Sequence, residues 1–106
     1  MPTPVMESVN LRFTNSTTVT YKPTAFPAMV SIDMAVDIDG TKTWVGSMNC
    51  WIHGTSPSYN LHFHESHTHQ GSPQITITPS VNASTGVLTI TSNQSVSGVA
   101  NVTCVI

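Results

Sequence analysis

The stretch from residue 28 to residue 52 constrains the fold more than any other part of the chain. From residue 28 to 38, large apolar side chains alternate with polar or small ones, the apolar set being Val30, Ile32, Met34, Val36 and Ile38. Side chains in a strand alternate between two faces, so this pattern predicts a strand with one buried face. Asp39-Gly40, a strong hairpin signal, follows, and we expect residues 42–52 to form the return strand.

The length of the loop decides which apolar residues of the two strands face each other. A three-residue loop with Gly40 near a bulge sets Val36 opposite Trp44 and Ile32 opposite Met48. A two-residue loop would set Val36 opposite a threonine and leave the apolar face unmatched. We therefore predict the bulged register.

The composition of the whole chain is that of a β protein. Only 8% of the residues are charged, against ~25% in an ordinary soluble domain. Polarity is carried instead by 16 Thr, 13 Ser and 7 Asn. Thr, Val and Ile favour strands, and no segment has a sustained helical apolar period. We predict one all-β domain over residues 1–106, a β-sandwich or jelly-roll-like fold of about seven to eight antiparallel strands.

Turn residues divide the remaining sequence into short expected strands. Asn15-Ser16 is expected to turn one N-terminal strand into the next, and Ser84 to Gly86 to close a later hairpin. The expected strands outside the central hairpin cover residues 8–14, 17–22, 59–64, 74–78, 86–91 and 99–106.

Charge and hydropathy exclude several classes of partner. The net charge is −2 and the only basic residues are Arg12, Lys22 and Lys42, so no basic face is expected to bind nucleic acid. No apolar run approaches the length of a membrane span. Residues 1–8 have neither the basic nor the apolar region of a signal peptide, which favours synthesis in the cytoplasm.

Histidines are concentrated in one segment, which reads HFHESHTH from residue 62 to 69. If Glu65-Ser66 forms a turn, the four histidines project from one face of a hairpin, with opposite Cβ atoms ~4.5–5.5 Å apart. Imidazoles at that spacing bind transition metals. The alternative is an exposed, pH-responsive polar cluster. The candidate metal ligands are His62, His64, His67 and His69.

Cys50 and Cys104 leave three interpretations open. Both lie in strand-like segments 54 residues apart, where they could cross-link two strands or remain buried thiols. The absence of a signal peptide favours the reduced thiols. A zinc site built from Cys50, His53 and the later histidines is the third option.

Catalytic residues do not stand out. The aspartates at positions 33, 37 and 39 follow a strand's solvent face and its turn, and no serine has a context that marks a nucleophile. Trp44, Trp51 and Tyr59 are expected to pack in the core or an interface rather than to bind sugar. We predict that the protein is not an enzyme.

One segment resembles a known family. The run from Ser66 to Gly71, preceded by His62-Phe63-His64, is similar to the His-x-His motifs of trimeric bacteriophage tail spikes and fibres. In that family, His-x-His pairs from three chains surround an axial iron. The small, weakly charged, Thr/Ser/Asn-rich chain also resembles phage head-decoration proteins.

These observations predict a structural virion protein of a bacteriophage, from the capsid or the tail. It would act as a homo-oligomer, a trimer by the resemblance, together with other virion proteins. A transition metal, zinc or iron, is the expected cofactor. The alternative is an extracellular β-sandwich binding module that holds a metal or a glycan.

Overall fold

The structure is a computed structural model that describes residues 6–106. Most of the segment expected to lack a signal peptide lies outside these described residues. The described chain forms six strands: β1 (Met6–Tyr21), β2 (Ala28–Ile38), β3 (Lys42–His53), β4 (Asn60–Gln70), β5 (Ile77–Val81) and β6 (Leu88–Val105). The all-β prediction is confirmed, and the prediction of seven to eight strands is wrong. Residues 6–106 include no helix of the length and apolar character needed to cross a membrane.

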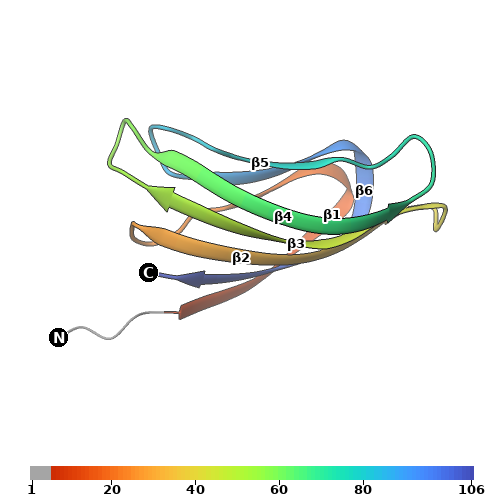
Figure 1. The fold of residues 1–106 in the computed structure, drawn as a ribbon, viewed down its shortest axis with the longest axis horizontal. Coiled ribbons are helices and arrows are strands. Elements are labelled where there is room, and N and C mark those ends of the chain that lie inside the picture. Colours follow the sequence, from red (N-terminus) through yellow and green to blue (C-terminus); the bar gives the residue numbers. More distant parts are fainter. Residues whose placement is uncertain (1–5) are drawn as a thin grey trace.

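All six strands belong to one antiparallel sheet with the order β1-β6-β2-β3-β4, and β5 pairs with β6. The first part of β6, up to Ser92, pairs with β5, and the part from Ser97 onward pairs with β2. Both long strands, β1 and β6, curve round at the same end of the molecule, so β5 and its neighbours lie over β2, β3 and β4 (Figure 1). The two layers are continuous through these strands, whereas the predicted sandwich would have had two separate sheets.

The strand count is lower than predicted because segments expected to turn continue as single strands. At Asn15-Ser16 the chain continues in β1, with shifts of register between Phe13 and Ser16 and between Ser16 and Thr18. Asn15 takes a positive φ of 47°. This conformation suits Asn and produces a bulge instead of the predicted turn. The segments 86–91 and 99–106 are likewise joined within β6.

The β2–β3 hairpin has the predicted register. Val36 lies opposite Trp44 and Ile32 opposite Met48. Asp39 and Gly40 have φ values of 53° and 66°, as a tight primed turn requires. The Thr41 amide donates to the Ile38 carbonyl at 2.9 Å. In the strand register, however, Ile38 is paired with Lys42. Thr41 is therefore the additional residue that makes this a three-residue loop with a bulge. The predicted turn before β6 is also confirmed, because the Gly86 amide donates to the Asn82 carbonyl at 2.8 Å.

The core lies between the two layers. The apolar faces of β2 and β3 are buried, and Trp44, Ile32 and Met48 are among the largest side chains fully removed from solvent. Leu88 and Ile90 of β6 are buried in the same cluster. We call the face of β2, β3 and β4 that looks toward this core the inner face, and the opposite one the outer face. Their different environments determine what the histidines of β4 can do.

Candidate functional site

The histidine segment is one continuous strand, which contradicts the predicted hairpin. All of β4, from Asn60 to Gln70, pairs with β3 without a shift of register, and Ser66 lies opposite Ser47. Glu65-Ser66 has no residue that favours a positive φ, and β3 offers a pairing partner along its whole length, so the extended conformation is preferred. The four histidines therefore do not share a face.

The inner face of β4 carries His67 and His69. They lie opposite Gly46 and Trp44 of β3. The His67 ring stacks on the buried Trp44 indole, with ring centroids 5.0 Å apart and an angle of 17° between the planes. Its Nδ1 lies 2.8 Å and 3.0 Å from the two carboxylate oxygens of Glu65. A carboxylate without a proton only accepts hydrogen bonds, so His67 Nδ1–H is the donor. In a neutral imidazole, Nε2 then remains available to accept a hydrogen bond or to bind a metal.

The outer face carries His62 and His64, together with His53, which the sequence suggested only as a zinc ligand beside Cys50. His53 of β3 stacks on His62, with ring centroids 5.1 Å apart and planes 5° apart. Trp51 lies directly opposite His62 and is 58% exposed. The missed signal was the alternation of β3, which puts residues 51 and 53 on the face that His62 also occupies.

Separation onto two faces changes the metal prediction. No single ion can be shared by all four predicted ligands of one chain, because the strand itself lies between the pairs. Within residues 6–106, no three His, Cys, Asp or Glu side chains are grouped in a way that could hold a metal ion. The binding of zinc or iron remains a prediction, now for two independent pairs, each of which would need further ligands from elsewhere.

Both cysteines are buried thiols on the inner face. Cys50 and Cys104 lie opposite Val30, one on each neighbouring strand. Two strand spacings put their Cα atoms ~9–10 Å apart, beyond the ~7 Å limit for a disulfide. Both are free in the structure, and burial raises the pKa of Cys50 to about 11. The zinc alternative fails as well, since Cys50 faces the core while His53 is exposed on the outer face.

Burial likewise raises the pKa of Cys104, beside Tyr21 and Glu7. The Tyr21 hydroxyl donates to Glu7 Oε1 at 3.0 Å, and burial together with its hydrogen bonds raises the pKa of Tyr21. Thr24 donates to the same carboxylate oxygen at 3.1 Å. These contacts tie the loop after β1 to the sheet beside Cys104, which is fully buried.

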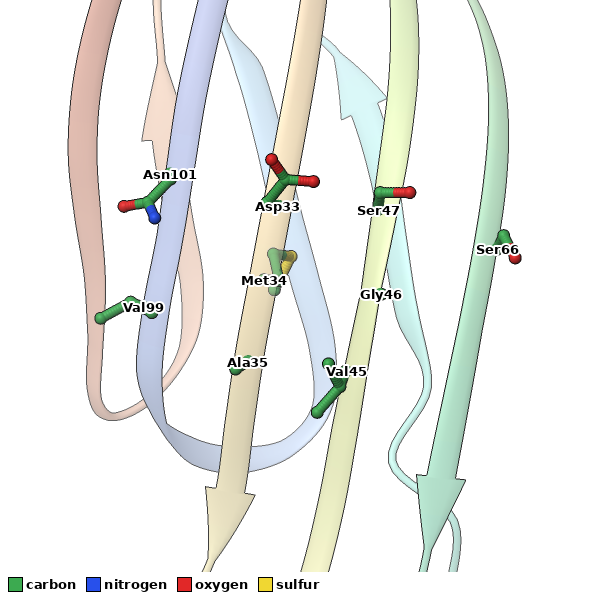
Figure 2. A pocket seen from close by; sticks show the side chains of 9 residues that line it. All are labelled: Asp33, Met34, Ala35, Val45, Gly46, Ser47, Ser66, Val99 and Asn101. Atoms are coloured by element: carbon green, nitrogen blue, oxygen red, sulfur yellow. The ribbon is translucent and has the colours of Figure 1, made fainter.

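The outer face has a shallow, open depression of about 410 Å³ across four strands. A polar row crosses it, formed by Asn101, Asp33, Ser47 and Ser66 from β6, β2, β3 and β4 (Figure 2). Small and apolar side chains, including Ala35, border this row. Its lining has one carboxylate, that of Asp33, and neither histidine nor cysteine.

A second row on the outer face is apolar and exposed. Met6, Val105, Met29 and Trp51 are successive neighbours across β1, β6, β2 and β3. Met6 is 68% exposed, Met29 54% and Trp51 58%. Large apolar side chains gathered in this way on a surface are typical of an interaction site rather than of free surface.

No protein-family model, no curated protein and no solved structure matches the chain.

Proposed function

We propose that the protein is a non-enzymatic structural component of a bacteriophage virion, in the capsid or the tail, which works as a homo-oligomer. The observation that carries this proposal is the exposed apolar row of Met6, Met29 and Trp51 on a sheet face with few charges. When a neighbouring subunit covers a face of this kind, apolar surface is removed from water, and this burial favours association. The His-x-His resemblance implies a trimer, and the number of subunits measured in solution is to be compared with three.

The arrangement of the acid–base groups supports a structural role. The hydrogen bond between Glu65 and His67 is the only contact between an acidic and a basic side chain in residues 6–106. The Trp44 and His69 rings lie against His67, and Met48 lies opposite Glu65, while Ser66 lies on the other face of the strand. The pair therefore cannot orient the Ser66 hydroxyl as a nucleophile.

Purified particles of the virus whose genome encodes the chain provide the test. Peptide mass spectrometry is expected to find the protein in many copies per particle, at a fixed ratio to the major capsid or tail protein. A matched sample from infected cells without assembled particles serves as the control. Recovery only outside particles would contradict the proposal.

A second candidate is an extracellular module that binds glycans, and the exposed Trp51 across from His62 favours it. An indole face on a sheet surface is a suitable platform for a sugar ring. Titration of oligosaccharides against the tryptophan fluorescence tests this function, with Trp51→Ser as the control variant. Saturable quenching that is lost in this variant would favour the module over the virion component.

A further inference from the structure

Three strands of the sheet have a free edge: β1, β4 and β5 each pair with a single neighbour. Free edges invite pairing with other chains, and natural proteins block them with bulges, prolines or basic residues. The β1 edge is interrupted by the register shifts on either side of Ser16 and also carries Arg12. The β5 edge contains Pro79. Two of the three edges are thus protected.

The β4 edge has none of these features. Its eleven residues contain no proline, lysine or arginine, and they pair with β3 without interruption. Among the described residues, no backbone hydrogen bond links β4 to anything except β3. Alternate residues therefore direct unpaired N–H and C=O groups outward along an edge without a bulge. Glu65, near the middle of this strand, is its only carboxylate.

We infer that β4 pairs antiparallel with β4 of a second copy, about a two-fold axis that passes through Ser66. A two-fold contact must pair inner-face residues with inner-face residues, so its axis passes through a residue rather than between two residues. An axis at Glu65 would place the two carboxylates opposite each other, which is unfavourable. An axis at Ser66 places each Glu65 opposite His67 of the other copy.

The Ser66 register also matches the other side chains. Each Glu65 already contacts its own His67 at 2.8 Å, so each carboxylate would be bordered by two imidazoles. Phe63, which is 49% exposed, faces His69 of the other copy and forms an aromatic cross-strand pair. An axis at His67 would instead bring the two His67 rings together and leave Phe63 opposite Gly71, beyond the strand's end.

This inference names the partner and one contact of the proposed homo-oligomer, and in that sense it rests on the proposed function. The contact is isologous and joins copies in pairs. A trimer would need a different, head-to-tail contact, and both contacts can coexist in a lattice. The edge contact is testable in the isolated protein, whereas the virion proposal is tested on particles, so the failure of one is distinct from the failure of the other.

Disulfide trapping tests the register. In Ser66→Cys the two new thiols lie on the axis, with Cα atoms ~4.5–5.5 Å apart, within the ~4.4–6.8 Å range for a disulfide. The control is Thr68→Cys, exposed on the same face of the same strand, whose two copies would be ~14 Å apart by strand rise. After mild oxidation, we expect at least ~10-fold more covalent dimer from Ser66→Cys. Equal trapping, or none from Ser66→Cys, would overturn the inference.

Charge reversal is the second test and introduces no reactive group. Glu65→Lys places an ammonium opposite His67 of the other copy, and sedimentation should show at least ~10-fold weaker self-association. Asp33→Lys makes the same change in charge on the exposed outer face, two strands from the β4 edge, and should leave association unchanged. Equal association of Glu65→Lys and the wild-type protein would overturn the register, whatever the particle analysis shows.

Discussion

Gly46→Ala tests the placement of the histidine strand. A Cβ on Gly46 would lie 2.6 Å from His67 Cβ and 2.7 Å from its Cα, and would also meet the Ser66 carbonyl oxygen. These are backbone and Cβ atoms of β4, which cannot rotate away as the end of a long side chain would. The substitution must therefore push β4 away from β3.

The expected cost follows from two opposing effects. Overpacking of a close contact typically costs ~1–3 kcal/mol. Replacing glycine by alanine in a compatible conformation recovers ~0.4–1 kcal/mol by restricting the unfolded chain. We expect the free energy of unfolding to fall by about 1–2 kcal/mol, which lowers the urea midpoint by roughly 0.5–1 M at an ordinary slope.

Urea unfolding followed by circular dichroism measures the effect. Ser47→Ala, the next residue of β3 with its side chain on the outer face, is the control and should stay within ~0.5 kcal/mol of the wild-type protein. If β4 folded back at Glu65-Ser66, Gly46 would have no such neighbour and alanine would be neutral or stabilising. A Gly46→Ala protein as stable as the wild type would therefore refute the continuous strand.

The other predictions concern the thiols, the apolar row and the histidine pairs. Both thiols should resist alkylation of the native protein at pH 8 and react after unfolding, whereas rapid native reaction would contradict their burial. Because the pKa of Cys50 is raised from 9.0 to about 11, its contribution to stability is complete below pH 9 and is lost as the pH rises from 9 to 11. The loss is roughly 2–3 kcal/mol, measurable by urea unfolding at each pH. Trp51→Ser should reduce incorporation into particles with little loss of stability, and normal incorporation would count against the apolar row. In calorimetric titrations with zinc, His67→Ala should abolish only the binding that also involves His69. His62→Ala should abolish only the binding on the outer face. Loss of all zinc binding in either variant would contradict two separate sites.

The central hairpin could be predicted because three local signals agree. Alternation defines the buried face, Asp39-Gly40 defines the turn, and the large residues Trp44 and Met48 distinguish the bulged register from the alternative. Merged strands could not be predicted in the same way. Asn15 is a strong local turn signal, but pairing along the whole of β6 makes a bulge the better solution, and that partner is distant in sequence.

The candidate site was predicted in part. The alternation of residues 59–64 predicts that Leu61 and Phe63 face inward and His62 outward, and pairing with β3 confirms this. The assignment failed beyond Glu65, because an expected turn inverted the face of every later residue. One error in local conformation thus moved His67 from the inner to the outer face.

Native mass spectrometry of the wild-type protein over a range of concentrations tests the central claim, that this chain functions by assembling with copies of itself. We expect homo-oligomers with an even number of subunits, whose population increases with concentration and decreases in Glu65→Lys. An isolated trimer would agree with the proposed function and contradict the two-fold contact at β4. A monomer at every concentration would contradict self-assembly itself.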